Sequence, residues 1–139
     1  MAIKVTAAVI EREGKILLLR RAPGQKLEGR WEFPGGKVEP GETDEDCLER
    51  ELREELGISG HTGAHVCDSV HHYAFGEILL RAYLFDWEGG QMQLRVHDQV
   101  RWLAPCELPD AGLAAADIPI ALALAQRGAV RAAEGGYGA

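Results

Sequence analysis

The chain lacks the features that mark membrane and secreted proteins. Within its 139 residues, no stretch approaches the roughly 18 uncharged apolar residues that a membrane span requires. The N-terminal residues run directly into an apolar, strand-like pattern, without the small-residue cleavage site of a signal peptide. We therefore expect a protein that acts in the cytoplasm and has no membrane partner.

Cysteines are also scarce. The chain has three, an odd number without C-x-x-C spacing, which argues against a disulfide framework and against a zinc site. We expect reduced thiols that serve as packing residues at Cys47, Cys67 and Cys106.

Basic residues are in the minority, because 15 Lys and Arg face 22 Asp and Glu and the net charge is -7. Polynucleotides are normally drawn in by a basic face, so we expect no polynucleotide partner. A phosphate ligand would have to bind together with a metal cation that offsets this negative charge.

The hydrophobic content of 46% is ordinary for one globular domain. We assign this domain to residues 1–133 and expect a flexible C-terminal tail at 134–139.

The apolar pattern changes period along the chain. Runs at 3–11 and 15–21 predict a β-hairpin, and runs at 64–75 and 77–89 predict a long antiparallel pair that turns near Gly76. A further short strand is expected at 99–105 and a last helix at 119–133. These elements predict an α/β or α+β fold, in which helices cover a mixed sheet.

Residues 43–56 carry the clearest helical pattern. Leu48, Leu52 and Leu56 repeat at i, i+4 and i+8, which places them in one buried stripe. Thr43 is suited to cap the N-terminus, and Gly57 is suited to end the helix.

Acidic residues crowd this helix and the loop before it. Between residues 39 and 55 there are nine carboxylates and two arginines. Glu51, Glu54 and Glu55 fall in one arc beside the leucine stripe. Like charges at i, i+4 cost an isolated helix about 0.2–0.5 kcal/mol per pair, and a lower dielectric near the core increases the repulsion. A hard divalent cation, Mg²⁺ or Mn²⁺, would neutralise them; the alternative is a solvated acidic face.

The preceding loop distinguishes these alternatives, because Gly35 and Gly36 permit a tight turn and Glu42 follows just ahead of the helix. Residues 36–58 match the pattern GX5EX7REUXEEXGU, where U is a bulky aliphatic residue, at all nine fixed positions. The match resembles the signature of the Nudix hydrolase family. This resemblance implies an α/β/α sandwich and hydrolysis of a nucleoside diphosphate linked to another group.

The resemblance also implies roles for the acidic residues. The three helix acids resemble Mg²⁺ ligands, with the backbone carbonyl of Gly35 as a further ligand. Bound metal ions would neutralise charge that develops on the phosphates and would lower the pKa of a bound water, and Glu51 or another carboxylate would take the proton of that water. The acids to which the resemblance gives this ligand role are Glu51, Glu54 and Glu55.

Other motif positions resemble supporting residues. Arg50 resembles the residue that orients the helix carboxylates, and Glu42 resembles a support of the loop and helix. Many family members also use a glutamate from a later loop, just ahead of a tryptophan that resembles Trp102. Val96 stands at that position here, so Asp98 or bulk water is expected to fill the ligand position.

The chain ends resemble the MutT-type branch, which converts nucleoside triphosphates to a monophosphate and pyrophosphate. Arg21 matches a nucleotide-contacting arginine of that branch, although a solvated strand residue is the alternative. Gly36 and Lys37 are predicted to contact the substrate. Phe33 is predicted to line the base pocket, with core packing as the alternative.

Two departures from the guanine-reading pattern point to another base. Asp117 stands where MutT carries Asn, and Ala82 stands where MutT has a base-stacking aromatic residue; both resemble bacterial CTP pyrophosphohydrolases. Asp117 can accept a hydrogen bond from the exocyclic amine of cytosine, or it can cap the last helix. Tyr83 is the predicted base-stacking residue.

The predicted function is therefore that of a Mg²⁺-dependent nucleoside triphosphate pyrophosphohydrolase that acts on CTP, dCTP or modified pyrimidine nucleotides. The alternatives are an 8-oxo-dGTP diphosphatase, a non-catalytic nucleotide-binding regulator, and a hydrolase of dinucleotides or nucleotide sugars. The expected partner is a small nucleotide, and the expected assembly is a monomer or homodimer.

Overall fold

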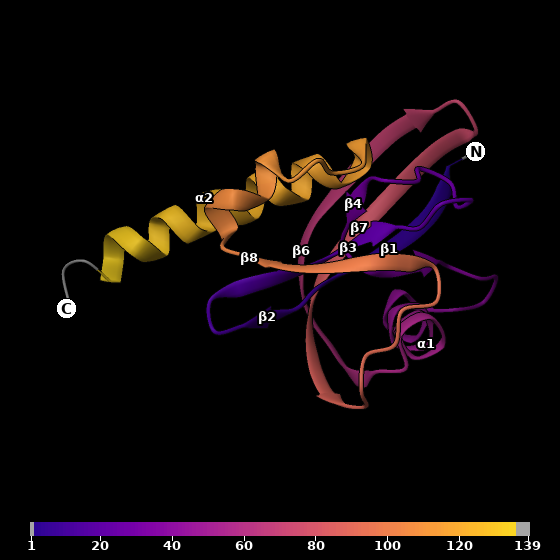
Figure 1. Cartoon of the computed structure of the whole chain (residues 1–139), viewed down its shortest axis with the longest axis horizontal. Coiled ribbons are helices and arrows are strands. Elements are labelled where there is room, and N and C mark those ends of the chain that lie inside the picture. The colour runs from indigo at the N-terminus through magenta and orange to yellow at the C-terminus, as the bar shows by residue number, and fades with distance from the viewer. Residues whose placement is uncertain (1, 136–139) are drawn as a thin grey trace.

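The computed structural model describes residues 2–135 as two small sheets with helices packed against them. Figure 1 shows the arrangement. In chain order, the elements are β1 (Ile3–Val9), β2 (Glu11–Arg12), β3 (Lys15–Arg21), β4 (Trp31–Glu32), β5 (Gly35–Lys37), α1 (Asp44–Leu56), β6 (Ser59–Tyr73), β7 (Gly76–Gly89), β8 (His97–Leu103), the 3₁₀-helices η1 (Pro105–Asp110) and η2 (Ala115–Asp117), and α2 (Ile118–Gly135).

The strands form a mixed sheet and an antiparallel sheet. The first has the order β5-β1-β7-β6, in which β1 runs parallel to β7, and the pairs β5–β1 and β7–β6 are antiparallel. The second is built around β3, which pairs with β2 and β4 and also with β8. The mixed sheet expected from the sequence is confirmed.

The two α-helices lie on opposite sides of the strands (Figure 1). The leucine stripe of α1 packs on one side with Tyr83 and Phe85 of β7, and α2 and η1 close a second apolar core on the other. Leu48, Leu52 and Leu56 are at most 1% exposed, and full burial of such a side chain stabilises the fold by about 1.5–3 kcal/mol. This layering confirms the predicted α/β/α sandwich.

The predicted hairpin at the N-terminus is only partly correct. Residues 11–12 do fold back on β3, through a turn at Glu13 and Gly14 that both have positive φ. However, β1 belongs to the other sheet, between β5 and β7. The reason is burial on both faces, because Ala7, Ala8 and Val9 are all at most 2% exposed and suit a central strand.

The remaining local predictions agree closely with the structure. Thr43 caps α1 by accepting a hydrogen bond from the N–H of Asp46 at 3.1 Å, and Gly57 ends the helix with φ 69. The tail predicted at 134–139 begins within α2, and residues 136–139 lie outside the described residues. Neither helix within residues 2–135 combines the length and apolar character that a bilayer crossing demands. Cys47 is buried and Cys67 is partly buried, whereas Cys106 is exposed, so the packing role expected for Cys106 is wrong.

Candidate active site

The acids of α1 occupy different environments although they lie within two turns. The side chain of Glu51 is 14% exposed, whereas that of Glu54 is 60% exposed. Glu51 and Glu55 line a cavity, while Glu54 lies beside Arg50. Because the leucine stripe fixes the rotation of α1, all three acids border the buried face of the helix.

Arg50 connects the helix acids to the preceding loop. Its guanidinium donates to both carboxylate oxygens of Glu42, at 2.6 and 2.9 Å, and to Glu51 and Glu54, at 3.0 and 3.1 Å. It also donates to the backbone carbonyl of Lys37 at 3.2 Å. Hydrogen bonding from Arg50 is the main cause that lowers the pKa of Glu42 to about 2. Arg50 and Glu42 therefore have the geometry that their predicted supporting roles require.

The glycine loop packs too closely against its neighbours to carry side chains. A Cβ atom on Gly35 would lie 1.9 Å from the carbonyl oxygen of Thr6. A Cβ atom on Gly36 would lie 2.1 Å from the carboxyl carbon of Glu51. The two glycines thus let β5 approach β1 and the acids of α1 at the same point.

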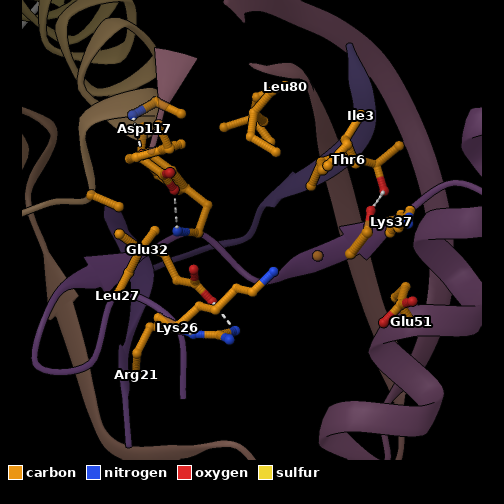
Figure 2. A pocket seen from close by; sticks show the side chains of 18 of the residues that line it. Ile3, Thr6, Arg21, Lys26, Leu27, Glu32, Lys37, Glu51, Leu80 and Asp117 are labelled. Atoms are coloured by element: carbon orange, nitrogen blue, oxygen red, sulfur yellow. Dashed lines mark hydrogen bonds and ion pairs between the residues drawn. The ribbon is translucent and has the colours of Figure 1, made fainter. Parts of the chain in front are cut away.

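The cavity has a volume of about 380 Å³ and extends from these acids to η2. In Figure 2, Glu51 lies on one wall, and Glu32 and Asp117 lie across the cavity from it. Cationic side chains of Arg21, Lys26 and Lys37 also line it. Both the volume and the mixture of charged and apolar walls are typical of a small-molecule site.

Burial and mutual repulsion disfavour the charged forms of the cavity acids. Burial is the main cause that raises the pKa of Glu51 and raises that of Glu55 to about 7, and the charge of Glu51 is the next cause for Glu55. Within residues 2–135, no three acidic, histidine or cysteine side chains form a ready-made metal site. The repelling carboxylates nevertheless provide an oxygen-only donor set that suits a hard cation such as Mg²⁺.

The far end of the cavity contains a second pair of acids. Asp117 accepts the backbone N–H of Phe33 at 3.0 Å, and burial, followed by the charge of Glu32, raises its pKa well above the ordinary value. Glu32 accepts from Arg21 at 3.2 Å and is 2.8 Å from Nε2 of His97. Arg21 thus lines the cavity and pairs with Glu32, so the alternative that Arg21 is a solvated strand residue is not supported.

Sequence reasoning missed several of the cavity residues. Glu32 and Lys26 come from β4 and from the loop before it, and Tyr73 and Phe75 come from the end of the β6–β7 hairpin. The two aromatic rings stack with their centroids 5.0 Å apart. The sequence signals were an acid between two aromatic residues and the i, i+2 spacing of Tyr73, at the end of β6, and Phe75, in the turn that follows.

Two predicted site residues lie elsewhere. Tyr83 is on the face of β7 that packs against α1, and its hydroxyl donates to Asp44, because strand alternation turns it away from the cavity face of Leu80. Its assignment to base stacking is therefore corrected. Asp98 accepts two hydrogen bonds from the guanidinium of Arg20, each at 2.8 Å, and is not among the residues that line the cavity. A metal role for Asp98 remains a prediction that these contacts do not support.

Comparisons with known proteins agree with this geometry. A family model described as the NUDIX domain matches residues 2–124. The chain is 42% identical over 132 residues to the CTP pyrophosphohydrolase of Escherichia coli K12. The matched region covers 95% of this chain and 98% of that relative. It is 39% identical over 116 residues to a Mycobacterium tuberculosis protein named putative 8-oxo-dGTP diphosphatase 2, with 81% of each chain covered. The solution structure of the E. coli ORF135 protein superposes with a TM-score of 0.81 at 43% identity, over 95% of this chain and 92% of that one.

Proposed function

The chain belongs to the Nudix family, and on this basis we propose that it hydrolyses cytidine and deoxycytidine triphosphates, or modified pyrimidine nucleotides, to a monophosphate and pyrophosphate. The observation that carries this proposal is the cavity that joins the acids of α1 to Asp117. A triphosphate placed beside the acids brings its base to the far wall. We also propose that residues 1–133 form one catalytic domain.

Nudix hydrolases generally use divalent metal ions, and we assign Mg²⁺, or Mn²⁺ in its place, to the carboxylates of Glu51, Glu54 and Glu55 and the carbonyl of Gly35. A bound ion would supply charge neutralisation for the phosphates and a water of lowered pKa. The chain itself orients the acids through Arg50 and takes the proton of the attacking water with a helix carboxylate. We assign this proton transfer to Glu51, which lines the cavity, or to another of the helix carboxylates.

The cations of the cavity support a polyphosphate substrate. Arg21, Lys26 and Lys37 line it together with the acids, and positively charged side chains stabilise phosphate oxygens by charge-assisted hydrogen bonds. The net charge of -7 would otherwise oppose such a ligand.

The base preference rests on the buried carboxyl of Asp117. Cytosine presents an amine donor beside a ring nitrogen acceptor, and uracil presents the reverse order. The carboxyl of Asp117 can accept a hydrogen bond from the exocyclic amine of cytosine, and uracil has no amine at that position. Burial, followed by the charge of Glu32, raises the pKa of Asp117, and a carboxyl oxygen can accept this hydrogen bond whether or not the group carries a proton.

A substrate panel tests this proposal. The protein is incubated with Mg²⁺ and CTP, UTP, dCTP, 5-methyl-dCTP, 8-oxo-dGTP or ADP-ribose, and pyrophosphate and phosphate are assayed separately. Pyrophosphate release from CTP or dCTP, with kcat/KM above that for UTP, is the expected result, and Glu51→Gln serves as the inactive control. A preference for 8-oxo-dGTP would transfer the assignment to oxidised purines. No turnover of any triphosphate would reject the hydrolase proposal.

A further inference from the structure

His97 is a buried polar residue for which the hydrolytic reaction has no evident use. It begins β8, and its side chain is 0% exposed. Because β3 pairs with both β4 and β8, the start of β8 lies close to Glu32 at the end of β4. The fold thus brings an imidazole from late in the chain against an acid of the cavity.

The hydrogen bonding of His97 is directed at Glu32. Nε2 lies 2.8 Å from Oε2 of Glu32, and within residues 2–135 the other ring nitrogen has no hydrogen-bond partner. A carboxylate can only accept, so Nε2 is the donor. Since burying a polar ring with one unpaired nitrogen is unfavourable, packing alone would favour an apolar side chain at this position.

Two donors meet on one oxygen of Glu32. Nη1 of Arg21 lies 3.2 Å from Oε2, which also receives the hydrogen bond from His97. Fixing Oε2 from behind leaves Oε1 available to a ligand in the cavity. Figure 2 shows the Glu32 carboxylate between Arg21 and the wall that carries Asp117.

Without His97, Arg21 would be the remaining partner that holds Glu32. Arg21 is itself shared, because it also donates to the backbone carbonyl of Lys26 and the side chain of Gln25. A single contact from a long side chain leaves the carboxylate free to rotate. The imidazole, held in the packed interior, is the more rigid of the two supports.

We propose that His97 is a positioning residue for base selection, which aims the free oxygen of Glu32 at the exocyclic amine of the base beside Asp117. The identity of the base in this inference rests on the proposed function, whereas the contact between His97 and Glu32 is observed in the structure. His97 acts through Glu32 and touches neither the phosphates nor the acids of α1. Its loss should therefore weaken base discrimination through KM and leave kcat within about threefold, since binding interactions lost equally in ground and transition states raise KM alone.

The experiment compares His97→Leu, His97→Gln and His97→Asn in the full chain. A glutamine amide reaches about as far as Nε2 and can donate to Glu32, whereas the asparagine amide falls short. We expect the CTP/UTP ratio of kcat/KM to fall at least about tenfold in His97→Leu and His97→Asn, and to be largely restored in His97→Gln. Calorimetric binding of CMP and UMP gives the same comparison without turnover.

A double-mutant cycle separates positioning from general stability. If His97 acts through Glu32, adding His97→Leu to Glu32→Ala should not change the CTP/UTP ratio further. The inference is overturned if the wild type and a folded His97→Leu variant have equal CTP/UTP ratios of kcat/KM. If His97→Leu does not fold, equal ratios in His97→Gln and His97→Asn overturn it instead. If the wild-type protein binds CMP more tightly than UMP but hydrolyses no triphosphate, the proposed function is rejected and the inference about His97 is not.

Discussion

Glu54 differs from the other two acids of α1 in being held at the surface. Its side chain is 60% exposed and receives one hydrogen bond from Arg50, whereas Glu51 is 14% exposed at the cavity. Exposed ion pairs contribute little to folding stability, typically about 0–1 kcal/mol. We therefore expect Glu54 to contribute to catalysis, as one of the proposed metal ligands, more than to folding stability.

Glu54→Gln should lower kcat at least about a hundredfold and change the melting temperature little, because metal-centred stabilisation of a phosphoryl transition state is worth several kcal/mol. Steady-state kinetics at saturating Mg²⁺ and a thermal melt measure both effects. Glu45→Gln, at an exposed position on the same helix, is the matched control. Near-normal turnover in Glu54→Gln would remove this acid from the metal site.

Among the elements, α1 was predictable to the residue and β1 was not. The cap at Thr43, the leucine stripe and the stop at Gly57 are local signals that act within a few residues. One of the two partners of β1 is β7, far along the chain, and no local pattern encodes that pairing. The same reason explains the site: the acids of α1 follow from one motif, whereas Glu32 and His97 meet only through pairing with β3.

The close contact between β5 and α1 predicts that a side chain at Gly36 impairs catalysis. Gly36→Ala would place a methyl group 2.1 Å from the carboxyl carbon of Glu51, so the acid must move. We expect kcat to fall about tenfold or more, since small displacements of catalytic groups are costly, with a smaller change in stability. Gly63→Ala in β6, where the nearest atom lies at 3.4 Å, is the control and should keep wild-type kinetics. Equal kcat values for the two variants would contradict this packing argument.

In the whole molecule, the cavity collects acids from distant parts of the chain and holds them near one another. The pKa of Glu55 rises from 4.5 to about 7, mainly through burial. The native state therefore binds a proton more tightly than the unfolded state does. Because of this difference, the free energy of unfolding should decrease as pH rises from about 4.5 to 7.

Thermal melts in EDTA test this expectation. The melting temperature of the wild type should fall between pH 5 and pH 8, and the fall should be smaller in Glu55→Gln, which cannot ionise at that position. At pH 7.5, millimolar Mg²⁺ should raise the wild-type melting temperature by mass action, and EDTA should abolish activity without unfolding. Glu45→Gln should keep the wild-type slope. An identical slope in Glu55→Gln would show that Glu55 does not contribute.

The parallel pairing of β1 with β7 also determines when the protein can fold. Ile3 pairs with Ile78 and Val9 with Leu84, so the central sheet cannot form until most of the chain has been synthesised. Contacts between residues so distant in sequence slow folding, because a long loop must close before they stabilise anything. Until then β1 has only the short strand β5 as a partner, so the edge that later pairs with β7 is open and apolar residues of β1 are exposed. A nascent chain that stops before β7 is thus the species most prone to aggregate, and folding should begin as the ribosome releases the second half of the protein.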